Sequence, residues 1–62
     1  MIYYAVVQGY YNNGKVTANI LTVPSESKPD DIYKSTKRCD IYIDYFDTYE
    51  AALQFKTDAL NA

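Results

Sequence analysis

Two runs rich in β-branched and aromatic residues lie near the start of the chain, on either side of Asn13-Gly14. The first covers residues 2–11 and the second covers residues 16–23. An Asn-Gly pair between two such runs is typical of a β-hairpin with a type I′ turn, because both central residues of that turn need positive φ. We therefore predict a hairpin with strands over 2–11 and 16–23.

This turn would pair Tyr11 with Val16 and would separate the hairpin side chains into two sets. One set is apolar or small throughout: Ala5, Val7, Gly9, Tyr11, Val16, Ala18, Ile20 and Thr22. The other is polar near the turn and apolar at the far end: Tyr4, Val6, Gln8, Tyr10, Thr17, Asn19, Leu21 and Val23. Because a slip by one residue would mix these classes, we expect the first set to face the core.

Residues 24–37 contain two prolines and an Asp-Asp pair, and they are predicted to form a loop, with Pro29 opening a single helical turn. Residues 38–45 alternate again and predict a half-buried strand with its aliphatic side on the core. Cys39, Ile41, Ile43 and Tyr45 share that side of the strand, and Asp40, Tyr42 and Asp44 share the other.

The last segment predicts a helix over residues 48–60. Asp47 is the expected N-cap, with Glu50 three residues later as in a capping box. Ala52, Phe55 and Ala59 form the central apolar stripe. The predicted fold is therefore α+β, a single domain over 1–62. It has a three-stranded antiparallel sheet in chain order and one C-terminal helix on one face.

The net charge of −2 in 62 residues is unevenly distributed, because residues 39–62 hold five acids against Lys56 alone. Such an acidic end repels phosphate backbones. Cys39 is the single cysteine and forms no internal disulfide, which fits a reducing compartment and a cytoplasmic location. The longest uncharged stretch contains polar residues and does not resemble a membrane span.

The residue types in this chain do not favour an enzyme. The chain has no histidine, so Cys39 lacks an imidazole partner and is expected to be a buried, inert thiol. Asp40 and Asp44 share a strand face, but four residues separate them by about 13 Å, too far for one metal ion or a glycosidase pair. We expect no enzyme activity, no metal and no cofactor.

The predicted sheet face opposite the helix is the main candidate interaction surface. Its residues combine apolar, aromatic and acidic side chains: Tyr4, Val6, Tyr10, Leu21, Val23, Asp40, Tyr42 and Asp44. In a two-layer domain this face is covered by a partner or a second copy, or by the 24–37 loop through Ile32 or Tyr33.

Residues 42–53 resemble the closing strand-to-helix turn of integrase arm-binding domains and of the hybrid-binding domain of certain ribonucleases H. Their pattern is roughly F-x-T-x-x-E-A, which Phe46, Thr48 and Ala52 match, while Ala51 stands where the families usually have glutamate. The resemblance implies a three-stranded sheet with a helix. Those families bind DNA through a basic sheet face, whereas the corresponding face predicted here carries Asp40 and Asp44.

The sequence therefore predicts a small acidic protein-interaction module that binds a protein partner or forms a homodimer. Compact acidic proteins of this kind are typical of regulators or inhibitors encoded by phages and mobile elements. The alternative is a nucleic-acid-binding domain that contacts phosphates through Lys34, Lys37 and Arg38.

Overall fold

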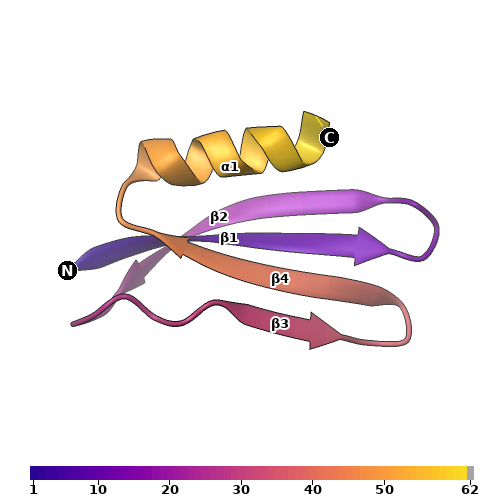
Figure 1. Ribbon diagram of the computed structural model, residues 1–62, viewed down its shortest axis with the longest axis horizontal. Helices are drawn as coiled ribbons and strands as arrows, with labels where there is room; N and C mark the ends of the chain where they lie inside the picture. The colour runs from indigo at the N-terminus through magenta and orange to yellow at the C-terminus, as the bar shows by residue number, and fades with distance from the viewer. Residues whose placement is uncertain (62) are drawn as a thin grey trace.

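The computed structural model describes residues 1–61 as a four-stranded antiparallel sheet with one helix (Figure 1). The elements in chain order are β1 (Ile2–Tyr11), β2 (Val16–Pro24), β3 (Ile32–Ser35), β4 (Cys39–Phe46) and α1 (Tyr49–Asn61). The predicted α+β class, the hairpin, the strand before the helix and the C-terminal helix are confirmed. The predicted number of strands is wrong, because the sheet has four.

The additional strand, β3, lies inside the segment expected to be a loop, and no helical turn follows Pro29. All four of its residues are exposed, so it lacks the alternation that marks a half-buried strand. Backbone pairing with β4 holds it instead. At the connecting turn, the Thr36 N–H donates to the Cys39 carbonyl (2.9 Å), and Thr36 Oγ1 accepts from the Cys39 N–H (3.2 Å).

The strand order is β2-β1-β4-β3, so β1 is central and pairs with both β2 and β4. The expected chain-order sheet, with the second strand in the middle, is therefore wrong. Burial along β1 explains the difference, because Ala5 and Val6 point to opposite faces and are 2% and 0% exposed. A strand buried on both faces belongs in the interior of a sheet.

The hairpin turn contains three residues rather than two. The Tyr11 N–H donates to the Lys15 carbonyl (2.8 Å), and the Gly14 N–H donates to the Tyr11 carbonyl (3.0 Å). Gly14 has φ +89°, and no other residue type has positive φ within residues 1–61, so the expected type I′ turn is wrong. The pattern is that of a turn closed by a left-handed glycine bulge. Asn13 supports it by accepting from the Lys15 N–H through Oδ1 (3.0 Å).

The three-residue turn shifts the hairpin register by one residue. Ala5 lies opposite Leu21 rather than Thr22, and Val6 lies opposite Ile20. Since neighbouring strand residues point to opposite faces, the slip changes which β1 residues share a face with Ile20. The helix covers the Val6 and Ile20 face, where Ala52 of α1 is also fully buried.

The residues expected to face the helix do so in β2, where Ile20 lies beneath it. In β1 the prediction is wrong, because Val6 faces the helix and Val7 faces away. Aromatic pairs fix this assignment, because the Tyr4 ring lies 5.8 Å from Tyr49 and the Phe46 ring lies 5.1 Å from Phe55. Phe46 alternates with the aliphatic side of β4, so Ile41 and Ile43 lie on the face away from the helix, contrary to expectation.

Helix α1 begins one residue later than predicted. Thr48 is the N-cap, since its Oγ1 accepts from the Ala51 N–H (3.2 Å), and the expected role of Asp47 is wrong. The predicted stripe is confirmed, with Ala52 buried and Phe55 and Ala59 half-buried. The helix packs on β1, β2 and, less extensively, β4, and so leaves β3 uncovered.

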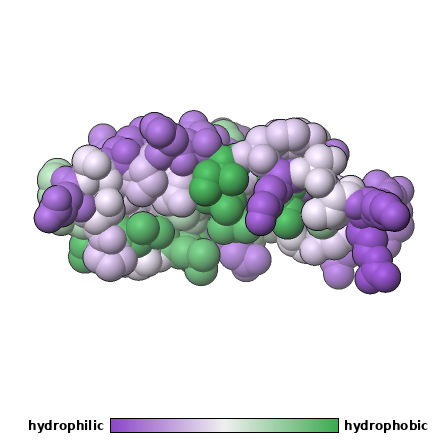
Figure 2. All heavy atoms as spheres, turned by 90° about the horizontal axis from the view of Figure 1, so that it is seen from below, coloured by the Kyte–Doolittle hydropathy of each residue, from purple (hydrophilic) through white to green (hydrophobic). Residues whose placement is uncertain are grey.

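Residues 25–31 connect the two edges of the sheet. The segment is tied to Met1, directly before β1, by the Ser25 N–H, which donates to the Met1 carbonyl (2.9 Å). It is tied to β4 by Asp31 Oδ1, which accepts from the Tyr45 N–H (3.2 Å). Figure 2, a view from below, shows apolar side chains gathered in the centre and along one side. The helix-free face contributes exposed Leu21 and Ile32.

Replacing Gly14 with alanine should lower the free energy of unfolding by about 1–2 kcal/mol, because a side chain disfavours left-handed backbone. A Cβ at this position meets no atom within 4 Å, so the loss is conformational rather than steric. In a domain of this size, thermal unfolding should shift down by about 4–8 °C per kcal/mol. Gly14→Asn is the control and should lose less. Wild-type stability in the alanine variant would contradict the three-residue turn.

Candidate functional site

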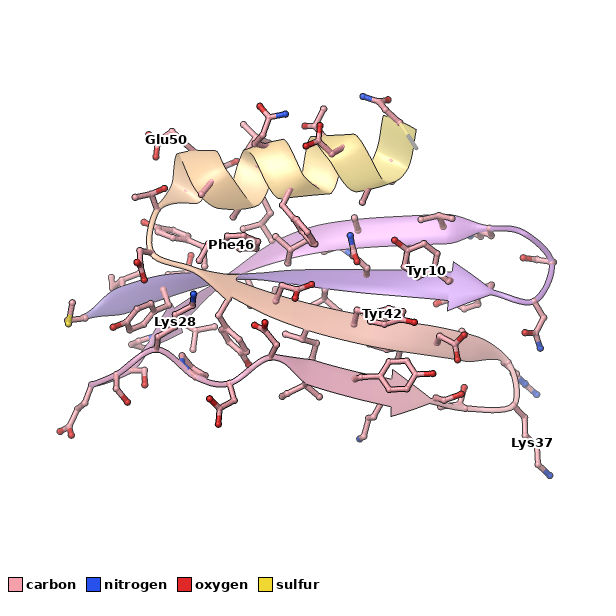
Figure 3. The ribbon with its side chains drawn as sticks, in the orientation of Figure 1. Tyr10, Lys28, Lys37, Tyr42, Phe46 and Glu50 are labelled. Atoms are coloured by element: carbon pink, nitrogen blue, oxygen red, sulfur yellow. The ribbon has the colours of Figure 1, made fainter. Side chains whose placement is uncertain are left out.

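On the helix side of the sheet, strands β1, β4 and β3 form three cross-strand rows that run from beneath the helix to the uncovered part of the sheet. The rows are Tyr10, Asp40 and Ser35; then Gln8, Tyr42 and Tyr33; then Val6 and Asp44. We call the part made of the exposed Tyr10, Tyr33 and Tyr42 and the half-buried Asp40 and Asp44 the tyrosine–carboxylate surface. Figure 3 shows Tyr10 and Tyr42 side by side on neighbouring strands.

Three tyrosine rings form a ladder across this surface. The Tyr10 and Tyr42 ring centroids are 5.6 Å apart at 85°, an edge-to-face contact, and those of Tyr33 and Tyr42 are 4.8 Å apart at 40°. All three side chains remain exposed. Because each ring is held by its neighbour, binding a ligand here would cost little side-chain entropy.

Asp40 lies beside the ladder, two residues from Tyr42 along β4 and opposite Tyr10. Its Oδ1 accepts from Ser35 Oγ (2.7 Å) and, at 3.5 Å, from the Tyr33 hydroxyl. Desolvation, followed by the nearby Tyr33 and Asp40, raises the pKa of the Tyr42 hydroxyl above its ordinary value of 10.0. Gln8, Tyr10, Asp40 and Tyr42 line an open hollow here. Gln8, at 5% exposure, is the one buried polar side chain among residues 1–61.

A second acidic group, Asp44, lies two residues from Tyr42 in the other direction along β4. Burial raises the pKa of the Asp44 carboxyl, and the negative charge of Asp31 and a hydrogen bond with it raise the pKa further. Sequence reasoning missed Asp31 because it lay in the expected loop. No lysine or arginine of β1, β3 or β4 shares this face, since Lys34 points to the other side. Carboxyl groups thus flank Tyr42, the middle ring of the ladder, on both sides along β4.

The eight residues predicted as one interaction surface do not lie together. The structure brings Tyr10, Asp40, Tyr42 and Asp44 onto one surface. The remaining residues lie elsewhere: Tyr4 packs against Tyr49, Val6 is buried beneath the helix, and Leu21 and Val23 are on the helix-free face. The one-residue register shift accounts for this division.

The predicted basic residues lie at the turn end of the sheet. Lys34 is on the helix-free face of β3, and Lys37 and Arg38 are in the turn between β3 and β4. Figure 3 shows Lys37 projecting from this end. Asn12 joins this turn to the hairpin turn, because its Nδ2 donates to the Lys37 carbonyl (2.7 Å) and its N–H donates to the Arg38 carbonyl (3.1 Å). Lys15 directly follows the hairpin turn.

Cys39 is buried and free, as expected for a structural thiol, with its Sγ 3.6 Å from Thr36 Oγ1. Within residues 1–61, no group of three histidine, cysteine or acidic side chains has the arrangement to hold a metal ion. Over the same residues, no helix combines the length and apolar character needed to cross a bilayer.

No protein-family model matches this chain, and no curated protein or solved structure is significantly similar to it. The resemblance to integrase arm-binding and hybrid-binding domains therefore stays a prediction. In the structure, its three matching residues serve the helix: Thr48 caps α1, Ala52 is buried on the inner side of α1, and Phe46 packs against Phe55. The chemistry of the exposed surfaces is thus the basis for assigning a function.

We predict that Asp31→Asn lowers the pKa of Asp44, because the variant removes a negative charge while the burial of Asp44 persists. The pKa of Asp44 lies above its ordinary value of 3.8 in the folded protein. This group therefore makes the free energy of unfolding rise as pH falls through its folded pKa. The Asp44 carboxyl carbon, followed by NMR against pH, measures the shift directly.

The matched control for this titration is Asp58→Asn on the outer part of α1, where Asp58 accepts from Gln54 Nε2 (2.9 Å). This change should leave the Asp44 titration unaltered. An identical Asp44 titration in the wild type and in Asp31→Asn would contradict the interaction between Asp31 and Asp44.

Proposed function

We propose that this chain is a non-enzymatic interaction module that binds a positively charged segment of a partner protein through the tyrosine–carboxylate surface. The observation that carries the proposal is the ladder of Tyr10, Tyr42 and Tyr33, exposed and flanked by Asp40 and Asp44. None of the three strands that form it adds a basic side chain to this face.

The chemistry of these residues matches arginine and lysine. A guanidinium group stacks on a tyrosine ring and pairs with a carboxylate, and an exposed cation–π contact contributes about 0.5–1 kcal/mol. Tyrosine also provides a large contact area with a polar end, which favours it at protein interfaces. The net charge of −2 would help to steer a basic partner toward the surface.

The biological role consistent with this surface is that of a small regulator or inhibitor, of the type that phages and mobile elements encode. A partner that uses arginine and lysine to bind phosphate groups would lose that site when Asp40 and Asp44 engaged the same cations. Asp47 and Glu50 extend the acidic charge to the start of α1, where Figure 3 shows Glu50 at the surface.

The test is an NMR titration with a peptide of alternating arginine and glycine, compared with a glutamate peptide of the same length. We expect shifts at Tyr10, Tyr33 and Tyr42 with the arginine peptide alone. Tyr42→Ala should raise the dissociation constant at least about tenfold, equivalent to 1.4 kcal/mol. Asp40→Asn, which removes charge and keeps the shape, should also weaken binding and reduce its dependence on salt.

Tyr11→Ala is the matched control for Tyr42→Ala. The two tyrosines are almost equally exposed, 40% and 38%, but Tyr11 points to the opposite face of the sheet. The control variant should bind the arginine peptide as the wild type does. Equal weakening in both variants, or equal binding of the glutamate peptide, would refute the proposed surface.

A second candidate function is nucleic-acid binding at the turn end of the sheet. The observation in its favour is that Asn12 joins the hairpin turn, which Lys15 directly follows, to the distant turn that carries Lys37 and Arg38. The adjacent hollow is lined by Tyr11, Asn12, Asn13 and Arg38, which combine an aromatic ring, amides and a cation.

This alternative predicts a complex with single-stranded DNA or RNA that weakens steeply as salt rises. The measurement is a gel shift at low ionic strength with the wild type and with the double change Lys37→Glu and Arg38→Glu, which should abolish the complex. If no complex forms at low ionic strength, the nucleic-acid function is excluded.

A further inference from the structure

Strand β2 forms one edge of the sheet and is unusually unprotected. Its residues 16–23 include no charged side chain and no proline, and its outer side is unpaired within residues 1–61. Natural edge strands are usually short or carry charges, prolines or bulges, because open strand edges attract other strands. The opposite edge follows this rule, since β3 has only four residues.

The outer side of β2 presents a regular row of free backbone groups. Hydrogen bonds from Tyr11 to Lys15 and from Ser25 to Met1 show that the odd-numbered residues of this strand face β1. The even-numbered residues therefore direct their N–H and C=O groups outward. They are Val16, Ala18, Ile20 and Thr22. Pro24, which has no N–H, ends the row.

The helix offers an apolar flank above the same edge. Phe55 points toward β4, where it meets Phe46. With 100° between successive helical residues, Leu53 and Leu60 lie on the opposite flank, toward the outer side of β2. They are 43% and 48% exposed. Figure 1 shows α1 running along β2, at the side of the sheet away from β3.

We propose that β2 pairs antiparallel with β2 of a second copy of this chain, so that two sheets join into one of eight strands. Pairing Val16 with Thr22 and Ala18 with Ile20 of the other copy uses all four outward-facing residues. This register puts the two-fold axis at Asn19. The two α1 helices then contact each other through Leu53 and Leu60.

The spacing of the layers favours a second copy as the occupant. Strands lie about 4.8 Å apart. Because α1 packs over both β1 and β2, its axis lies about one strand spacing from the two-fold axis. The two helices would therefore be about 10 Å apart, near the usual packing distance of 8–10 Å. Residues 16–23 contribute no charge to this interface, and the charged group of α1 nearest to it is the half-buried Lys56, which lies 100° from Phe55 on the same flank as Leu53 and Leu60.

This interface is separate from the tyrosine–carboxylate surface, which lies across β1, β4 and β3 and stays open in the dimer. The inference therefore goes beyond the proposed function. If the protein is a dimer that does not bind the arginine peptide, only the proposed function fails. If it is a monomer that binds the peptide, only the proposed dimer fails.

The first test measures the solution mass by sedimentation equilibrium. The wild type should have twice the 7.1 kDa mass of the chain. Leu53→Lys should shift the mass toward the monomer, because it buries a charge in the helix contact. Ile32→Lys is the matched control, since Ile32 is similarly exposed at 44% but lies at the other edge, and it should leave the dimer intact. A monomeric wild type overturns the proposal, as does a dimeric Leu53→Lys variant.

The second test keeps the helix flank unchanged and probes the register in a Cys39→Ala background. In the Asn19→Cys variant, the two copies of residue 19 lie about 4.5 Å apart between Cα atoms, within the disulfide range, and diamide should yield a covalent dimer. In the Thr17→Cys variant, the equivalent residues lie about 13 Å apart and should not join. Cross-linking of Thr17→Cys but not Asn19→Cys, or of neither, overturns the register.

Discussion

The central position of β1 is the constraint on which the rest of the structure depends. Ala5 on one face and Val6 on the other are both almost fully buried, and β1 pairs along its length with both β2 and β4. The two hydrogen bonds of the hairpin turn, from the Tyr11 N–H to Lys15 and from the Gly14 N–H to Tyr11, then set the register of β2 against β1. Because side chains alternate along a strand, this turn decides which residues lie beneath the helix.

The helix covers only part of the sheet, for a geometric reason. A helix is about 10 Å across, which corresponds to two strand spacings, so one helix cannot cover four strands. Helix α1 lies over β1 and β2, where Ala52 allows a close approach. Two surfaces follow from this offset: the tyrosine–carboxylate surface beside the helix, and the flank of Leu53 and Leu60 above the edge of β2.

The two surfaces have different chemistry and suit different partners. The first combines rigid tyrosine rings with Asp40 and Asp44, which suits cationic side chains. Burial and the charge of Asp31 raise the pKa of the Asp44 carboxyl, and perturbed carboxyl groups of this kind concentrate at functional sites. The second surface is apolar and bordered by free backbone groups, which suits a strand and helix of the same kind.

Local patterns in the sequence were sufficient for the hairpin strands, for the alternation of Ile41 and Ile43 with Tyr42, and for the helix with Ala52 and Phe55 on its inner side. These features depend on neighbouring residues, whose periodicity is visible in the sequence. The tertiary structure decided the strand order, the existence of β3 and the register of β2. An exposed edge strand is held by its partner's backbone rather than by its own side-chain pattern. A two-residue turn and a three-residue turn differ by one residue, and this difference changes which β1 side chains share a face with those of β2. The surface of Tyr10, Tyr33 and Tyr42 is formed by pairing between strands that are distant in the sequence.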